Sequence, residues 1–406
     1  MPDLLDAFLA FALALIVVWI STPVVKSLAW RIGAIDEPRE RGLHQMPTPR
    51  LGGLAILAGV IAAGLIWLPH DRQTHGILIG AGVIVAVGVA DDLLDLSADV
   101  KLAGQVLAAV IPVASGVRVD TMTLPFFGHI DLGHLSYPLT VIGIVAVMNI
   151  VNFIDGIDGL AAGVCTIAGI TFAVIALSLN RNAAGVLAML TAGAALGYLR
   201  HGFHPASIFL GDSGSNLLGY MLATIAVQGA LKTNAVIALV FPLVILAVPI
   251  LDSSFVIAKR IKYGKPVYLA DRWHFHHRFA NIGFSQRRTV FYLYGWTLSL
   301  AALALALRFV PYSDNHGHFN LDWSLVMVAF AIPAMLASVY LVLVLEILKL
   351  KRFRQFQLRR AHMLRGEPPP AEAEVDASVV HELETGEFEI LRTPDEPTER
   401  PRSEHP

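Results

Sequence analysis

The sequence predicts an all-α, polytopic integral membrane protein with about eleven transmembrane helices. Hydrophobic residues make up 55% of its 406 residues and charged residues only 15%, whereas a soluble domain carries roughly 25% charged residues. Apolar stretches of about 18 or more residues recur along the chain, and each is long enough to cross a hydrocarbon core about 30 Å thick. These observations exclude an ordinary soluble domain.

Hydropathy and length place the individual spans. The first has Asp3 and Asp6 at its start, where a cleaved signal peptide would have basic residues, so it is interpreted as a retained helix. Gly and Ala are frequent inside the spans, as close helix packing in lipid favours. The predicted limits are 4–25, 51–69, 77–92, 101–116, 138–152, 159–179, 184–200, 214–230, 235–257, 290–310 and 322–348.

The distribution of Lys and Arg predicts the orientation. If the N-terminus is outside, the cytosolic loops contain most of the basic residues, including Lys101 and a dense set between 259 and 288. The opposite side receives only Arg72, Arg118, Arg181, Lys232 and Arg308. Because cytosolic loops are enriched in Lys and Arg, we expect an outside N-terminus and a cytosolic C-terminus.

The chain divides into three predicted parts. Residues 1–348 form the polytopic membrane domain, and 349–365 form a basic juxtamembrane segment suited to anionic headgroups. Residues 366–406 are rich in Pro, Glu, Asp and Ser, which predicts a disordered acidic tail. The net charge of −2 gives no footprint for nucleic acid, and the single cysteine, Cys165, excludes an intramolecular disulfide.

Four polar motifs lie at the ends of predicted spans. They are Asp91-Asp92-Leu-Leu-Asp95, the segment Asn149–Gly159 (NIVNFIDGIDG), the segment Phe209–Ser215 (FLGDSGS) and the segment Asp271–Arg278 (DRWHFHHR). Each follows an odd-numbered span, so the topology places all four on the cytosolic side. Ionisable groups at membrane depth cost about 2.5–3.5 kcal/mol each on insertion scales, so this collection predicts a functional site.

The residue types suit metal and phosphate chemistry. Carboxylate and amide oxygens are hard ligands of the kind that Mg²⁺ takes. The i, i+4 spacing of Asp91 and Asp95 places them on one helix face, with Asp92 on another. Asn149, Asn152 and Asp155 share a face if their span is helical.

The third and fourth motifs predict phosphate binding. Gly-Asp-Ser-Gly-Ser opens a helix, where free backbone N–H groups favour a phosphate. The histidines of the fourth motif and Arg278 offer donors to phosphate oxygens. A zinc site at these histidines is the alternative interpretation.

Taken in this order, the motifs resemble the polyprenyl-phosphate N-acetylhexosamine-1-phosphate transferases, and specifically the bacterial undecaprenyl-phosphate GlcNAc-1-phosphate transferase branch. The segment Arg41–Gly53 is similar to the first cytosolic loop of that family. The resemblance covers about residues 25–300.

The resemblance implies transfer of HexNAc-1-phosphate, most simply GlcNAc-1-phosphate, from a UDP-sugar to undecaprenyl phosphate, with release of UMP. The implied cofactor is Mg²⁺, for which Mn²⁺ can substitute. The implied partners are the UDP-N-acetylhexosamine, undecaprenyl phosphate, membrane lipid and a second copy in a homodimer. The implied location is the bacterial inner (plasma) membrane, with a site that faces the cytosol.

The resemblance also implies roles for individual residues. The metal ligands would be Asp212, principally, with Asn152 and Asp155. Asp91 would be the candidate base for the lipid phosphate, and the histidine loop would contact the diphosphate or sugar. The implied catalytic residues are Asp91, Asp92, Asp155, Asp158, His276 and His277, and the implied substrate-binding residues are His44, Arg50, Asn149, Asn152, His274 and Arg278.

Physical chemistry favours the metal role over the base role. The second pKa of a phosphate monoester is about 6, so a lipid phosphate is already mostly a dianion at pH 7. The harder problem is to bring one anion onto another, which cations and alignment address.

Three alternatives stay open at the level of sequence. The branch that transfers phospho-MurNAc-pentapeptide typically has Lys at the position of Asp95 and three consecutive histidines, unlike this chain. Buried ionisable residues also mark transporters, although those bind near the midplane at broken helices. A membrane scaffold would tolerate neutralisation of Asp91 and Asp212.

Overall fold

The structure is a computed structural model that describes residues 4–37, 46–124, 128–230, 285–311 and 320–342, with a few further residues within 246–251 and 358–377. The chain separates into two compact units. One contains 1–269 and 286–334, and the other contains 270–285 and 335–406. The predicted juxtamembrane segment and tail lie mostly outside the described residues, so their boundaries stay predictions.

The described part of the chain is built from α-helices. Seven of them are long and apolar enough to cross a membrane, and α2 is apolar but shorter, which confirms the prediction of an all-α, multi-pass membrane protein. The helices are α1 (Leu4–Ile32), α2 (Gly52–Trp67), α3 (Arg72–Leu94), α4 (Ala98–Ala114), α5 (Ser136–Ile154), α6 (Leu160–Ser178), α7 (Asn182–Gly202), α8 (Gly211–Ala230), α12 (Gln286–Phe309) and α13 (Leu321–Val342). The predicted span 235–257 lies almost wholly outside the described residues.

Two short antiparallel hairpins and one 3-10 turn join the helices. Strands β1 (Ile35–Asp36) and β2 (Thr48–Pro49) pair between α1 and α2. Strands β3 (Thr121–Leu124) and β4 (Gly128–Asp131) pair between α4 and α5, and the turn η1 (Gly133–Leu135) follows them. Both hairpins lie in connections between helices, so the helical bundle alone carries the core.

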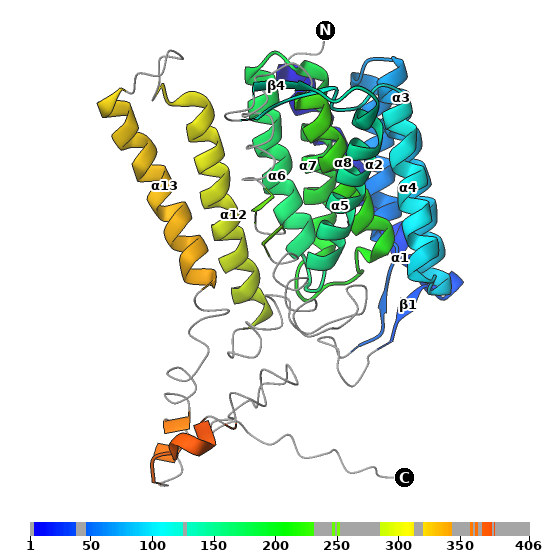
Figure 1. Ribbon diagram of the computed structural model, residues 1–406. Helices are drawn as coiled ribbons and strands as arrows, with labels where there is room; N and C mark the ends of the chain where they lie inside the picture. Colours follow the sequence, from blue (N-terminus) through cyan, green and yellow to red (C-terminus); the bar gives the residue numbers. More distant parts are fainter. Residues whose placement is uncertain are drawn as a thin grey trace, which may run out of the picture. The chain divides into compact units, whose positions relative to one another are not determined.

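Helix α8 is the centre of this bundle. It packs against α2, α3, α5, α6 and α7, while α4 covers α3 and α5 and α1 packs against α2 and α7 (Figure 1). Residues 213–225 of α8 are buried all round, and the hydroxyl of Tyr220 donates to the carbonyl of Ile77 on α3. A helix that is enclosed on every side presents its polar groups to solvent only at its ends. The start of α8 is therefore a natural place for a site.

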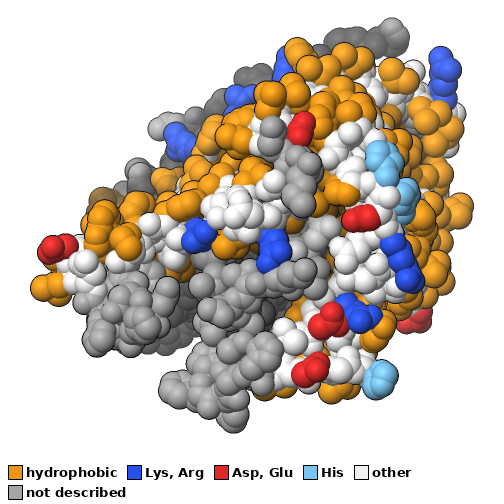
Figure 2. Space-filling model, turned by 90° about the horizontal axis from the view of Figure 1, so that it is seen from above, with side chains coloured by type: hydrophobic (Ala, Val, Ile, Leu, Met, Phe, Trp, Pro, Cys, Tyr) orange, Lys and Arg blue, Asp and Glu red, His pale blue; other side chains and the backbone are white. Residues whose placement is uncertain are grey.

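Peripheral helices instead carry exposed hydrophobic side chains. Trp19 and Ile20 on α1, and Leu321 and Leu325 on α13, are largely exposed, as expected for surfaces that face lipid. Figure 2 shows the end of the molecule at which α1 begins, where charged side chains of both signs are scattered among hydrophobic ones. The orientation of the chain in the membrane stays a prediction.

Candidate active site

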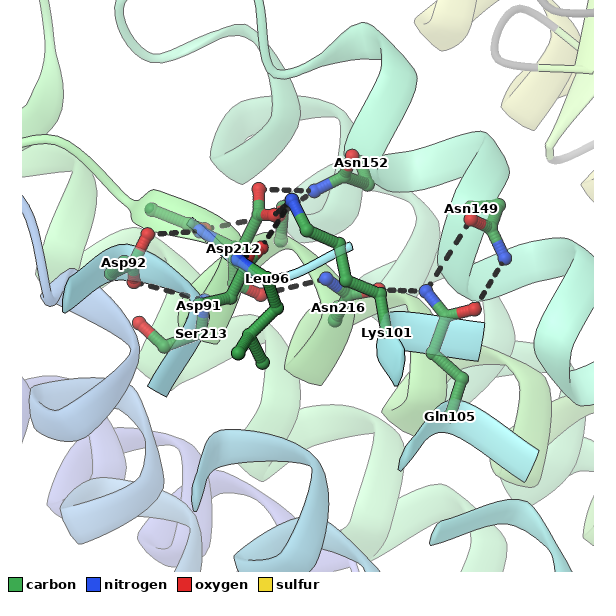
Figure 3. Close-up of polar contacts among 12 residues, drawn as sticks. Asp91, Asp92, Leu96, Lys101, Gln105, Asn149, Asn152, Asp212, Ser213 and Asn216 are labelled. Atoms are coloured by element: carbon green, nitrogen blue, oxygen red, sulfur yellow. Dashed lines mark hydrogen bonds and ion pairs between the residues drawn. The ribbon is translucent and has the colours of Figure 1, made fainter. Parts of the chain in front are cut away.

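Three of the four predicted motifs meet at one end of the bundle. The last turn of α3 carries Asp91 and Asp92, the last turns of α5 carry Asn149 and Asn152, and the first turn of α8 carries Asp212. Figure 3 shows these side chains converging, together with two residues of α4. Segments that are up to 120 residues apart in sequence thus contribute to one site.

The first group of contacts is the charged cluster, which we define as Asp91, Lys101, Asn152 and Asp212. The Lys101 Nζ lies 2.6 Å from Asp91 Oδ2 and 3.2 Å from Asp212 Oδ2. The Asn152 amide donates to Asp212 Oδ1 at 2.9 Å. The Asp91 side chain is only 4% exposed, whereas those of Lys101 and Asp212 are about one-third exposed. Lys101 and Asp212 are therefore accessible to a ligand, whereas Asp91 is a buried counter-charge that pairs with Lys101.

The second group is the amide cluster, which we define as Gln105, Asn149 and Asn216. The Gln105 Nε2 donates to Asn216 Oδ1 at 2.8 Å, and the Asn149 Nδ2 donates to Gln105 Oε1 at 2.8 Å. The Asn216 Nδ2 in turn donates to the carbonyl of Asp212 at 2.8 Å. Gln105 and Asn216 are buried. The hydrogen bonds between Asn149 and Gln105 join α5 to α4. The predicted contact of Asn149 with substrate stays a prediction.

Asp92 contacts the backbone of α8. Its carboxylate accepts from the Asp212 N–H at 2.9 Å and from the Ser213 N–H at 3.2 Å. The sequence predicted that the free amides at the start of α8 would bind a phosphate. For these two amides the prediction is wrong, because a carboxylate of α3 already occupies them.

Asp155 and Asp158 lie in the turn between α5 and α6. Burial raises the pKa of Asp155 well above its ordinary value, and the carboxylates of Asp212, Asp158 and Asp92 raise it further. Asp158 accepts from the Ala206 N–H at 3.0 Å and contacts the His204 Nδ1 at 2.8 Å. Asp158 therefore links this turn to the connection between α7 and α8 by hydrogen bonds. Asp155 lies close enough to Asp212 for the two carboxylates to repel each other.

Other predicted residues lie elsewhere or outside the described residues. The Arg50 guanidinium pairs with Asp36 across the β1–β2 hairpin, so its visible contact is within the protein. The predicted residues His44, His274, His276, His277 and Arg278 lie outside the described residues.

Asp95 corrects one expectation about the first motif. Helix α3 ends at Leu94, and Asp95 adopts a left-handed conformation with φ of 51°. The shared face expected for Asp91 and Asp95 requires the helix to continue, and it does not. Asp91 is consequently buried while Asp95 is exposed.

Sequence reasoning did not place Lys101, Gln105 or Asn216 in the site. Lys101 was counted only as a loop cation, although its position one turn into the helix after the acidic motif was an available signal. Gln105 and Asn216 follow Lys101 and Asp212 by four residues, so each lies one helical turn deeper on the same face.

The residues present suit a hard divalent cation. Asp212 is accessible, and the pKa of Asp155 is raised first by burial and then by the nearby carboxylates of Asp212, Asp158 and Asp92, whose repulsion a cation would relieve. Among the described residues, no three His, Cys, Asp or Glu side chains form a ready metal cluster. Mg²⁺ is commonly held by one or two carboxylates with water and substrate phosphates, so a site of this kind needs no such cluster.

These features define a multi-pass membrane protein with a polar, carboxylate-bearing site at one end of its helices. A family model described as glycosyl transferase family 4 matches residues 74–230, from the start of α3 to the end of α8. A probable undecaprenyl-phosphate N-acetylglucosaminyl 1-phosphate transferase of Bacillus subtilis is 38% identical over 300 residues, which are 73% of this chain and 84% of that protein. The chain therefore belongs to glycosyl transferase family 4.

Two further relatives show the breadth of the family. A decaprenyl-phosphate N-acetylglucosaminephosphotransferase of Mycolicibacterium smegmatis is 38% identical over 314 residues, which are 70% of this chain and 77% of that protein. A phospho-N-acetylmuramoyl-pentapeptide-transferase of Caldanaerobacter subterraneus is 31% identical over 309 residues, which are 73% of this chain and 94% of that protein. The chain is thus more similar to the Bacillus and Mycolicibacterium proteins than to this pentapeptide transferase.

Proposed function

We propose that this protein transfers GlcNAc-1-phosphate from UDP-GlcNAc to undecaprenyl phosphate in the bacterial inner membrane, with its site facing the cytosol. The observation that carries the proposal is the accessible Asp212 carboxylate at the start of the central helix, held between Lys101 and Asn152. The names of the Bacillus and Mycolicibacterium relatives support the N-acetylglucosamine donor and the polyprenyl phosphate acceptor.

The reaction forms one phosphorus–oxygen bond and breaks another. An oxygen of the lipid phosphate attacks the phosphorus that carries the sugar, and the bond from that phosphorus to the bridging oxygen breaks. UMP leaves with the bonding electron pair. Both reacting groups are anionic, so positioning and charge compensation are the main tasks of the protein.

Lys101 supplies positive charge to this reaction. Its ammonium group lies between Asp91 and Asp212 and is about one-third exposed, so it can also reach a phosphate oxygen from the same position. Asp91 holds it there, because its two oxygens accept from Lys101 and from the Leu96 N–H at 2.9 Å. A buried carboxylate with both oxygens engaged is better suited to orient Lys101 than to remove a proton.

Mg²⁺, or Mn²⁺ in its place, would be held by Asp212 with Asn152 and Asp155, and it would neutralise charge on the donor diphosphate. The Asn152 amide fixes one oxygen of Asp212, and Asn152 itself contacts the Ser215 hydroxyl at 2.8 Å. These contacts hold the Asp212 carboxylate in one orientation.

Transfer of label into lipid tests the proposal. Purified protein in nanodiscs would be incubated with labelled UDP-GlcNAc, undecaprenyl phosphate and Mg²⁺, and label in the butanol phase and released UMP would be measured. We expect equal amounts of both, loss of both with a chelator, and loss of both in Asp212→Ala. Label in butanol no greater than in Asp212→Ala would contradict the proposal.

Donor competition separates the alternatives. UDP-GalNAc and UDP-MurNAc-pentapeptide would be supplied in parallel with UDP-GlcNAc, and we expect UDP-GlcNAc to give the highest kcat/KM. Transfer from the pentapeptide donor alone would identify the peptidoglycan reaction instead. Uptake of substrate into proteoliposomes without UMP release would identify a transporter.

A further inference from the structure

Helix α8 begins without a capping side chain of its own. The residues at its start are Phe209, Leu210 and Gly211, and none of their side chains can accept a hydrogen bond. A helix leaves its first backbone N–H groups without intrahelical partners, and Ser, Thr, Asp or Asn normally accepts from them. The start of the central helix therefore needs an acceptor from elsewhere.

Asp92 on α3 supplies this acceptor. Its two oxygens accept separately from the Asp212 and Ser213 N–H groups, at 2.9 and 3.2 Å, which is the contact that an N-cap residue normally makes within its own segment. Its negative charge also lies at the positive end of the α8 dipole. Figure 3 shows Asp92 directed at this backbone, while Asp91 is directed at Lys101.

The local backbone leaves space for this carboxylate. Gly211 has φ of +71°, and a Cβ there would lie 2.5 Å from Asp92 Oδ2. A Cβ at Gly88, one turn before Asp92 on α3, would lie 2.3 Å from the Ser213 Cα. Glycine on both helices thus permits α3 to approach the start of α8 closely enough for the cap.

The cap acts on the residue that matters most for the proposed reaction. The Asp212 backbone is held by Asp92 and its side chain by Lys101 and Asn152. We propose that Asp92 is a positioning residue that caps α8 from the neighbouring helix and so fixes Asp212, rather than a group that touches substrate or metal. The inference deepens the proposed function and rests on it for its kinetic test.

The test compares the same two substitutions at two aspartates. Asn keeps an acceptor oxygen and is itself a good N-cap, whereas Ala has no acceptor. We expect Asp92→Asn to retain at least about one-tenth of the wild-type kcat/KM and Asp92→Ala to lose about tenfold more. At Asp212, where the charge itself is required, Asn and Ala should be equally inactive. The apparent Mg²⁺ activation constant should rise in Asp92→Ala more than the KM for UDP-GlcNAc.

Substitution of two glycines of α3, Gly88 and Gly82, tests the close approach of α3 to α8 without removing a polar group. Gly88→Ala places a methyl group against Ser213, while Gly82→Ala on the same helix meets nothing within 4 Å. We expect Gly88→Ala to reproduce the Asp92→Ala pattern and Gly82→Ala to match the wild type.

Hydrogen–deuterium exchange supplies a measurement that does not depend on activity. In the full-length protein, amides 212 and 213 should exchange faster in Asp92→Ala than in Asp92→Asn, while the rest of α8 is unchanged. Equal kcat/KM of folded Asp92→Asn and Asp92→Ala, or unchanged exchange in Asp92→Ala, would overturn the inference. If the wild type transfers no label, the proposed function fails and exchange alone decides whether Asp92 is the cap.

Discussion

The charged cluster and the amide cluster share three helices, α4, α5 and α8, on which their residues lie one turn apart, and Asp91 of α3 belongs to the charged cluster alone. Helix α4 contributes Lys101 to the first and Gln105 to the second, and α8 contributes Asp212 and Asn216. Helix α5 contributes Asn152 and Asn149 in the same way. The charged cluster is partly exposed and the residues beneath it are neutral, mutually bonded amides.

This difference follows from the cost of burying charge. An ionised group away from water is unfavourable unless it is paired, whereas a buried amide needs only its hydrogen bonds. Lys101 and Asp212 therefore lie where water and ligand reach them, and the buried Asp91 is paired with Lys101. The amides hold the helices together one turn deeper. The comparison predicts that substitutions in the charged cluster should reduce catalysis and that substitutions in the amide cluster should reduce stability.

The largest effect is expected at Lys101. Lys101→Met removes the positive charge and leaves the buried Asp91 without its partner, so we expect kcat/KM to fall by about 10²-fold or more. The lipid-transfer assay measures this. The double variant Lys101→Met/Asp91→Asn removes both charges, so it should recover thermal stability but not activity. Arg118→Met, which breaks the exposed pair with Asp120, is the control and should stay within about twofold of wild type.

The two asparagines of α5 offer a matched pair. Asn152→Ala frees the Asp212 carboxylate, and loss of a group that orients a metal ligand costs about 10–100-fold, which should appear as a raised apparent Mg²⁺ activation constant. Asn149→Ala removes the contacts with Gln105 and with the Val145 carbonyl, none of which involves Asp212, and should leave that constant within about threefold of wild type. Equal shifts in the two variants would show that the two clusters do not differ in function.

Gln105 should affect stability more than chemistry. Gln105→Leu removes the donor to the Oδ1 atoms of Asn149 and of the buried Asn216, and an unsatisfied buried polar group costs about 1–3 kcal/mol. Thermal unfolding in nanodiscs should show the loss, and the Mg²⁺ activation constant should stay near the wild-type value. Gln105→Leu/Asn149→Leu removes both partners of one bond, so it should be less destabilised than the sum of its single variants.

Much of the site could be predicted from sequence, for a physical reason. Hydropathy fixes where helices cross the membrane, and the crossing number fixes which motif ends share a side, so Asp91, Asn152 and Asp212 could be grouped without any coordinates. Which oxygen meets which donor depends instead on helix rotation and close approach. The cap by Asp92 arises from such an approach, at Gly88, and no spacing rule encodes it. Lys101 was not recognised as a site residue because a cation near a span end is equally consistent with a solvent-exposed loop.

The smallest effect is expected at Asp95, within the same motif as Asp91. Asp95 is exposed and left-handed at the end of α3, and Asn tolerates that conformation. Asp95→Asn removes one exposed charge and keeps the backbone, so kcat/KM should stay within about twofold and stability within about 0.5 kcal/mol. Asp91→Asn, four residues earlier, should lose far more activity because Lys101 then lacks its buried counter-charge. A loss at Asp95 as large as that at Asp91 would mean that the exposed turn itself contacts a substrate. The charged cluster would then have to include the turn after α3 as well as residues of α3, α4, α5 and α8.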